Sequence, residues 1–389
     1  MRFRTSRDTL LRPLRVATGV VERRQTLPVL GNLLVEASDD GLTLRGTDLE
    51  VEIVARLTSG IDVERTGATT IPAHKLTDIW QSLPEGMDVS VALEQDRAVV
   101  RSGRSRFALA TIPATEFPTE RSMRDLADGA TADESTDRPS EDESEVDIVL
   151  PRADMHKLLE RTKFAMANGD PRYFLNGLLL ELTNHSLRAA ASDGHRMALC
   201  TLDGGAQGLK DRERAIIPRK SVQDLERLIG DSDEDVRLAV GKTRLKASQG
   251  DYTLTTKLVD GPYPDVDRLI PRNTDHSVTG DRETLRQALH RAAILSNDRA
   301  PEVRLTMDGE LLTIRATNPE HEEAEELVAV DYDGAQTTEI GFNARYIQDV
   351  LNALDTESIR VSMPEGNAIA LIEGPGAEDS LYIVMPVRL

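Results

Sequence analysis

The chain has 389 residues and a mass of 42.8 kDa, with 39% hydrophobic and 29% charged residues. It has no run of the ~18 uncharged apolar residues that a membrane-spanning helix needs, and its N-terminus lacks the apolar core of a signal peptide, so we expect a soluble, cytoplasmic protein of two or three domains. A single cysteine, Cys200, excludes an intramolecular disulfide and a cysteine-cluster metal site. The formal charge of −20 argues against DNA binding unless basic residues gather on one surface.

The same order of elements recurs three times along the chain, with a period of about 115 to 125 residues. Each copy opens with an amphipathic helix whose leucines follow three- to four-residue spacing. These helices are expected to begin at Ser6, Pro151 and Gly280, among small, acidic or proline residues suited to a helix N-terminus.

Strands and one further helix complete each copy. A pair of strands around a polar turn follows the first helix, as in LLVEASDDGLTLRGT. A short strand then leads into a second helix, as in IIPRKSVQDLERLIG, and three short strands follow. Each copy is therefore predicted to be an α+β unit of two helices and about eight strands. Because a helix followed by three strands occurs twice in it, each unit also contains a half-repeat.

One segment, residues 119–147, has a different composition from the rest of the chain. It holds eleven acidic and three basic residues and has no apolar period. Such a composition cannot bury enough surface to order itself, so we interpret it as a flexible acidic insertion, with a regulatory or binding segment as the alternative. Its local charge of −8 leaves −12 over the other 360 residues.

Features of enzymes are weak in this sequence. Ser192, Asp193 and His195 include the residue types of a hydrolytic triad, but no G-x-S-x-G pattern surrounds the serine. His321, beside a run of glutamates, resembles a metal cluster, although a solvated strand edge explains it as well. Neither a P-loop nor a dinucleotide-binding glycine motif is present. Three tandem copies of one unit favour a scaffold, and a three-domain metal-dependent hydrolase remains the alternative.

Short motifs in a fixed order resemble the bacterial DNA polymerase III beta subunit (sliding clamp) family. They are TLPVLGNLLVE, GTDLEVEIVAR, RSGRSRFALATIPATEFP, RYFLNGLLLE, SDGHRMALC, TTKLVDGPYPD, NPEHEEAEE and the C-terminal VMPVRL. The resemblance covers the whole chain except residues 119–147.

The resemblance implies a fold of three tandem DNA-clamp domains, each with two helices packed on antiparallel sheets. The domains would span 1–118, 148–270 and 271–389, with 119–147 as an acidic insertion. Two chains would form a head-to-tail homodimer, a six-domain ring whose helices line the hole. By family position, Phe107 and Leu109 of one chain would meet Ile294 and Leu295 of the other.

The resemblance also implies non-specific binding of double-stranded DNA, held by topology instead of base readout. The first helix of each copy is net basic, which supports a lining role despite the acidic total. Six residues match family positions near DNA: Arg24, Lys75, Tyr173, Phe174, Arg219 and Lys220. Phe174 replaces a more usual tyrosine, and Gly169 replaces a glutamine, which puts those two polar contacts in doubt.

The family binds short peptide motifs in a pocket between the second and third domains. The matching positions are Leu175, Ser192, Gly194, His195, Arg196, Met197, Pro264, Arg268, Leu269, Asn343, Tyr346, Ile383, Met385, Pro386, Val387, Arg388 and Leu389. An apolar groove of this kind can seat leucine and phenylalanine side chains of an extended peptide, with His195 and Arg196 at its rim. Ser192 and Met197 are mild departures from the family pattern.

The implied function is that of a processivity factor without catalysis, metal or cofactor. Its implied partners are a clamp-loader ATPase, the alpha subunit of the replicative polymerase, and other clamp-motif proteins, among them repair polymerases, ligase and mismatch-repair proteins. The implied location is the cytoplasm, at the nucleoid during replication.

Overall fold

The structure is a computed structural model that describes residues 1–118, 146–207, 209–230, 232–271, 276–297, 301–364 and 369–387. Most of the acidic segment 119–147, together with Arg388 and Leu389, therefore lies outside the described residues. The described chain combines helices with antiparallel sheets, as predicted. None of its described helices is long and apolar enough to cross a membrane.

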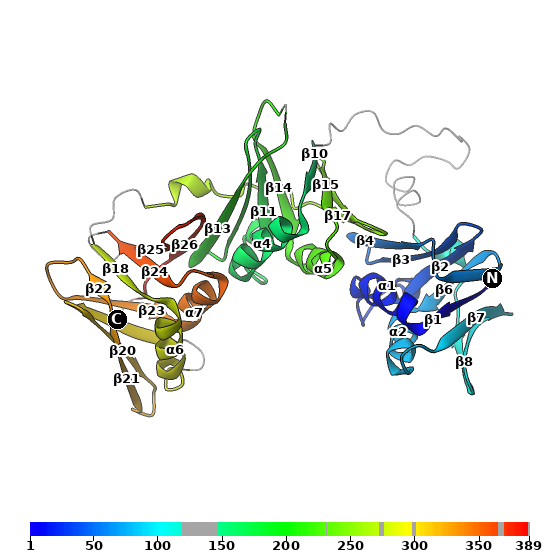
Figure 1. Cartoon of the computed structure of the whole chain (residues 1–389), viewed down its shortest axis with the longest axis horizontal. Helices are drawn as coiled ribbons and strands as arrows, with labels where there is room; N and C mark the ends of the chain where they lie inside the picture. The colour runs from blue at the N-terminus through cyan, green and yellow to red at the C-terminus, as the bar shows by residue number, and fades with distance from the viewer. Residues whose placement is uncertain are drawn as a thin grey trace. The chain divides into compact units, whose positions relative to one another are not determined.

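The chain forms two compact units (Figure 1). The first unit comprises Met1–Arg152 and Gln223–Leu258, and the second comprises Ala153–Val222 and Val259–Leu389. The α-helices of the described residues are α1 (Arg7–Gly19), α2 (Ala73–Ser82), α4 (Arg152–Thr162), α5 (Arg219–Ile229), α6 (Arg282–Ala293) and α7 (Ala344–Ala353).

The helices begin close to the predicted residues because local capping determines their N-termini. Ser6 precedes α1 and its hydroxyl accepts a hydrogen bond from the Thr9 amide at 3.0 Å. Asp281 caps α6 in the same way, accepting from the Thr284 amide at 2.8 Å. Helix α4 begins at Arg152, one residue after the predicted Pro151.

The first unit contains two sheets. In spatial order, the five-stranded sheet consists of β5 (Ile61–Arg65), β1 (Arg2–Ser6), β7 (Asp88–Glu94), β8 (Arg97–Ser102) and β9 (Ser105–Ala110). The eight-stranded sheet consists of β10 (Val146–Leu150), β15 (Val236–Val240), β16 (Arg244–Gln249), β17 (Tyr252–Lys257), β4 (Val51–Leu57), β3 (Gly41–Thr47), β2 (Asn32–Ser38) and β6 (Gly67–Pro72). Helices α1 and α2 pack on each other, and the Thr18 and Thr77 hydroxyls lie 2.8 Å apart between them.

The second unit also contains two sheets. The nine-stranded sheet consists of β14 (Glu213–Pro218), β11 (Gly177–Leu182), β12 (Ser186–Ser192), β13 (Arg196–Asp203), β26 (Ala377–Val384), β25 (Ala370–Gly374), β24 (Ser358–Met363), β18 (His276–Asp281) and β22 (Asp331–Tyr332). The four-stranded sheet consists of β21 (Glu323–Ala329), β20 (Leu311–Thr317), β19 (Glu302–Asp308) and β23 (Thr338–Asn343).

The predicted half-repeat is present and its two halves are interleaved. In each repeat, the strand before one helix pairs with the strands that follow the other helix. Thus β1 joins β7–β9 while β6 joins β2–β4 in the first repeat, and the same exchange recurs in the second and third. A half-repeat alone would leave its first strand without these partners, so the two halves of each repeat depend on each other for strand pairing.

Neighbouring repeats are joined by strand pairing as well as by covalent linkage. Within the first unit, β4 of the first repeat pairs antiparallel with β17 of the second. Within the second unit, β13 of the second repeat pairs antiparallel with β26 of the third. In both junctions the third strand after a repeat's first helix pairs with the third strand after the next repeat's second helix. Strands β9 and β21 occupy the two remaining positions of this kind and lie at sheet edges.

Candidate functional site

Three of the predicted pocket residues in the second unit belong to one apolar cluster. Leu175, Met197 and Ile383 are each at most 3% exposed and belong to this cluster. Its other buried members are Ala167, Leu179, Ala190, Leu199, Ile216, Tyr263, Val266 and Leu371. The cluster therefore combines side chains of the second repeat, the third repeat and the connector between them.

The C-terminal segment is fixed beside this cluster. Met197 and Ile383 are register partners in the β13–β26 pair. Beyond the pair, the Met385 amide donates to the His195 carbonyl at 2.8 Å, and the Val387 amide donates to the Gly341 carbonyl at 2.9 Å. Met385 is nevertheless 41% exposed, so the segment presents an apolar side chain to solvent beside a buried apolar floor.

The turn between β12 and β13 is shaped by its own side chains. The Ser192 hydroxyl donates to the Arg196 carbonyl at 2.8 Å and accepts from the Gly194 amide at 3.1 Å. Asp193 accepts from the amides of His195 and Arg196 at 2.9 and 3.0 Å, and Gly194 has a φ of 87°. These hydrogen bonds fix Ser192 and Asp193 in the turn. The exposed His195 ring stacks on Tyr346, with the two ring centres 6.5 Å apart.

Arg196 connects the second and third repeats. Its guanidinium pairs with Asp193 at 3.0 Å and with Asp349 of α7 at 2.5 Å, and it donates to the Phe164 carbonyl at 2.8 Å. It also lies 4.5 Å from the Tyr346 ring centre and 5.2 Å from that of Phe164. With 11% of its side chain exposed, Arg196 joins the two repeats and has few donors left for a ligand.

The remaining described residues of the predicted pocket lie on the connector, at the start of α7 and on the segment after β26. Arg268 and Leu269, on the connector, are exposed, with Arg268 3.2 Å from Asp265. Pro264, Pro386 and Val387 are half-buried. Asn343 caps α7 by accepting from the Arg345 amide at 3.0 Å. Burial raises the pKa of the Tyr346 hydroxyl.

Three aromatic or apolar residues at this cluster were assigned otherwise or missed. Phe174, predicted to stack on DNA bases, packs against the cluster and meets Tyr263 edge-on at 6.5 Å. Its neighbour Tyr173 is 56% exposed and free to stack. Tyr263 and Val266 were missed, although an aromatic residue between two prolines in GPYPD marks a fixed connector.

The other predicted DNA-binding residues differ in availability. Arg24 and Lys75, in the first unit, are exposed and have no ion pair among the described residues. In the second unit, Arg219 donates to the Met166 carbonyl at 2.7 Å, and Lys220 is half-buried. One guanidinium nitrogen of Arg219 is therefore already engaged with a loop carbonyl, although the side chain keeps its charge.

The predicted interface residues lie on the edge strand β9 and just after α6, the helix whose Arg291 pairs with Glu326 of the edge strand β21. Phe107 and Leu109 are half-buried on the edge strand β9. Ile294 follows α6 and is 69% exposed, and Leu295 beside it is half-buried. A large aliphatic side chain with that exposure is unusual unless another surface covers it.

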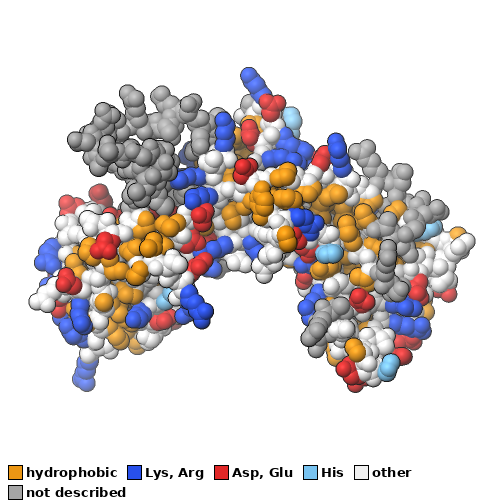
Figure 2. All heavy atoms as spheres, turned by 180° about the vertical axis from the view of Figure 1, so that it is seen from behind, with side chains coloured by type: hydrophobic (Ala, Val, Ile, Leu, Met, Phe, Trp, Pro, Cys, Tyr) orange, Lys and Arg blue, Asp and Glu red, His pale blue; other side chains and the backbone are white. Residues whose placement is uncertain are grey.

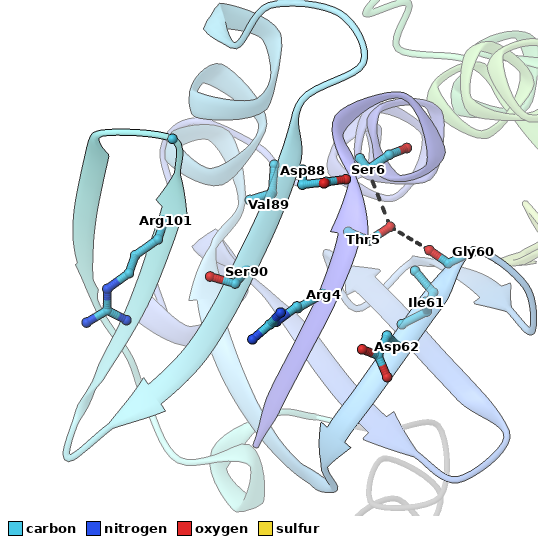
Figure 3. A pocket seen from close by; sticks show the side chains of 11 residues that line it. Arg4, Thr5, Ser6, Gly60, Ile61, Asp62, Asp88, Val89, Ser90 and Arg101 are labelled. Atoms are coloured by element: carbon cyan, nitrogen blue, oxygen red, sulfur yellow. Dashed lines mark hydrogen bonds between the residues drawn. The ribbon is translucent and has the colours of Figure 1, made fainter.

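A groove of about 650 Å³ lies elsewhere, on the five-stranded sheet of the first unit. Figure 3 shows Arg4 of β1 and Arg101 of β8 on either side of Ser90 of β7. Its lining mixes charged and apolar residues and contains none of the predicted site residues. Size alone therefore does not identify the functional surface of this chain.

Comparison with known proteins identifies the family. The family models of the DNA polymerase III beta subunit match in order: the N-terminal domain at residues 1–121, the central domain at 149–265 and the C-terminal domain at 267–388. The chain belongs to the DNA polymerase III beta subunit family.

Relatives in this family resemble the chain over its whole length. The beta sliding clamp of Escherichia coli strain K12 is 44% identical over 389 residues, with both chains fully covered. A Pseudomonas aeruginosa sliding clamp bound to griselimycin is 43% identical with a TM-score of 0.89, again with full coverage of both. A Caulobacter crescentus beta sliding clamp, with polyethylene glycol bound to a putative beta-motif tethering region, is 33% identical with a TM-score of 0.87 and full coverage of both.

Membership of the beta subunit family confirms the predicted function. The chain is a sliding clamp, a non-catalytic processivity factor of DNA polymerase III. The alternative of a metal-dependent hydrolase is not supported. Across the described part of the chain, no group of three or more His, Cys, Asp or Glu residues could hold a metal ion. The glutamates after His321 instead lie on and beside the edge strand β21.

Proposed function

We propose that two copies of this chain close head to tail into a ring around duplex DNA, each contributing domains 1–118, 148–270 and 271–389. The pairing rule at the two junctions carries this proposal. At each junction the third strand after a repeat's first helix, β4 or β13, pairs with the third strand after the next repeat's second helix, β17 or β26. Applied once more, the rule joins β21 of one copy to β9 of the other.

The side chains at these edges are complementary. Strand β9 carries Phe107 and Leu109, while Leu327 on β21 and Ile294 after α6 are 59% and 69% exposed. Joining the edges would cover these apolar groups and satisfy the free strand edges. Charge agrees as well, because arginines flank β9 and glutamates fill β21. These residues are Arg104 and Arg106 at the start of β9, and Glu323 on β21; the next two glutamates of β21, Glu325 and Glu326, pair with Arg315 and Arg291 of their own chain.

A contact between two different surfaces closes into a ring or continues into a filament. Closure with two copies predicts a particle of twice the chain's 42.8 kDa. Sedimentation equilibrium should give this mass over a range of concentrations above the dimer dissociation constant. A mass that keeps growing with concentration would indicate a filament and contradict the ring.

The proposed DNA-facing helices differ in how many of their cations are available. On α6, Arg286 pairs with Glu283 and Arg291 with Glu326, each at 2.6 Å. The hydrogen bonds from Arg286 and then Gln287 lower the pKa of Glu283 to about 2. On α4, Lys157 pairs with Asp379, and Arg161 pairs with Asp355 at 2.6 Å.

Helix α1 supplies the unpaired charge. Arg12 and Arg15 are exposed and have no carboxylate partner among the described residues, and Arg12 lies 5.1 Å from the Tyr252 ring centre. Arg24 and Lys75 of the same unit are similarly unpaired within the described part of the chain. Acidic and basic side chains are interspersed on the face in Figure 2. We therefore expect phosphates to bind where cations have no carboxylate partner, and not where net charge alone is positive. We therefore assign the main phosphate contacts to the first domain.

Replacing Arg12 and Arg15 together with alanine should weaken binding of a short labelled duplex, which can enter the ring from its end. The slope of log affinity against log salt should fall by about 1 for each phosphate that the variant no longer neutralises. The matched control is R286A/R291A, which removes the same charge from paired arginines and should leave the slope nearly unchanged. Equal slopes for the two variants would contradict this assignment.

We propose that the apolar cluster and the C-terminal segment form the pocket for partner peptides. An exposed Met385 and Leu269 beside a buried apolar floor suit leucine and phenylalanine side chains of an extended peptide. The Caulobacter relative, whose putative beta-motif tethering region holds polyethylene glycol, supports such a site in this fold. His195, exposed and stacked on Tyr346, is the rim residue best placed to meet a polar group of the peptide.

This pocket would tether the polymerase alpha subunit, and in turn repair polymerases, ligase and mismatch-repair proteins. A modest peptide contact suffices, because a polymerase held on a ring around DNA meets the primer end at high effective concentration. Opening the ring would require a separate loader ATPase, and the protein would act at the nucleoid during replication.

A further inference from the structure

A carboxylate is buried in the sheet behind the connector. Glu181 lies on β11 in the otherwise apolar run GLLLEL and is 1% exposed. In register it is directly opposite Arg188 on β12 and Arg214 on β14. Two guanidinium nitrogens of Arg214 each lie 2.7 Å from the same carboxylate oxygen of Glu181. A buried charge is costly unless it is paired in this way.

The sheet gathers more positive charge than Glu181 neutralises. Arg188 and Arg212 each lie 3.5 Å from Glu181, in addition to Arg214. Asp267 of the connector supplies a second carboxylate, which lies 2.7 Å from Arg188 and 3.1 Å from Arg212. The hydrogen bond from Arg188, and then that from Arg212, lowers the pKa of Asp267. Asp267 therefore holds the connector by electrostatic attraction to the positive charge that Glu181 leaves unneutralised on the three arginines.

Asp267 is the centre of the short 3-10 helix η5 (Val266–Arg268). On one side of it, Val266 is fully buried in the apolar cluster. On the other, the Leu269 amide donates to the Val266 carbonyl at 3.1 Å. The turn is therefore anchored twice, by Val266 in the cluster and by Asp267 on the arginines, and it carries Arg268 and Leu269 of the pocket.

We propose that Asp267 is a positioning residue for the peptide pocket: through Arg188 and Arg212 it holds the connector turn in the conformation that binds the peptide. This inference rests on the peptide-binding role proposed above. Because the connector turn is already fixed, it need not become ordered when the peptide binds. The conformational entropy lost on association is therefore smaller. Asp267 itself faces the arginines and need not touch the peptide.

Replacing Asp267 with asparagine tests this role, because the substitution keeps the size and removes the charge. The measurement is the dissociation constant of a fluorescent polymerase-derived clamp-motif peptide on the full-length protein. We expect D267N to weaken binding about 3- to 10-fold, as for loss of a charge-assisted hydrogen bond. The matched control is D147N, which removes a comparably exposed carboxylate from Arg237 in the first unit and should bind like the wild type.

A second variant separates positioning from a general structural effect. In an L269A background the Leu269 side chain that the turn presents to the peptide is already removed. D267N should then raise the dissociation constant by less than about 2-fold, because the two changes act on one element. Unchanged binding in D267N, or a full additive loss in L269A, would overturn the proposal. Failure of the wild-type protein to bind the peptide would instead refute the peptide-binding role itself.

Discussion

Replacing Ile294 with aspartate should convert the proposed dimer into monomers. The side chain is 69% exposed in the single chain, so the substitution costs the monomer little. At the proposed interface the new carboxylate would be buried among apolar side chains without a partner, at a cost of about several kcal/mol. Analytical ultracentrifugation should then give the 42.8 kDa mass of one chain at micromolar concentration.

The matched control is Leu27→Asp, because Leu27 is also a large exposed aliphatic residue, at 50%, and lies away from β9 and β21. This variant should keep the dimer mass. An I294D protein that sediments like the wild type would show that the ring does not close through this surface.

Replacing Met385 and Leu269 together with alanine should nearly abolish peptide binding. Both side chains are exposed apolar groups, at 41% and 39%, and each follows closely along the chain on a buried member of the cluster, Met385 after Ile383 and Leu269 after Val266. Truncating two central apolar side chains of an interface should weaken binding about 100-fold or more. Fluorescence anisotropy with the clamp-motif peptide measures this decrease in affinity.

The dimer mass of the M385A/L269A variant should stay unchanged, because neither residue lies on the edge strands. Leu27→Ala serves as the control for truncating an exposed leucine and should bind the peptide normally. An affinity for the peptide equal to that of the wild type would rule out the pocket.

The repeated architecture could be predicted from the sequence because local signals define its elements. Ser6 caps α1 where the sequence predicts a helix start, and the half-repeat is present in all three copies. The interleaving of the two halves was not predicted. Pairing β1 with β7 joins segments more than 80 residues apart, and alternation within a strand does not say which partner it takes.

Charge availability could not be read from the sequence either. The sequences of helices α4 and α6 carry a net positive charge. In the structure, however, Lys157 of α4 forms an ion pair with Asp379, which is 222 residues away along the chain. The first helix is different because Arg12 and Arg15 meet no acid in the described residues. Only the folded structure distinguishes paired arginines from those that can bind phosphates.

The proposed pocket rests on family positions in the sequence, whereas the ionic groups beside its connector turn were not predicted. Glu181 is a lone acid in an apolar strand, and this is the one sequence signal that could have suggested a buried ionic network. Its partners Arg188 and Arg214 become neighbours only through strand register. Asp267 joins them from the connector, more than 50 residues further along.

The most direct test of the central claim is retention on DNA of different topology. The protein is loaded onto a nicked circular duplex by the loader ATPase proposed above, and the complex is isolated by gel filtration. Half of the sample is then linearised with a single-cutting restriction enzyme. A ring held by topology should stay on the circle and slide off the linear molecule, whereas equal retention on both would contradict encirclement.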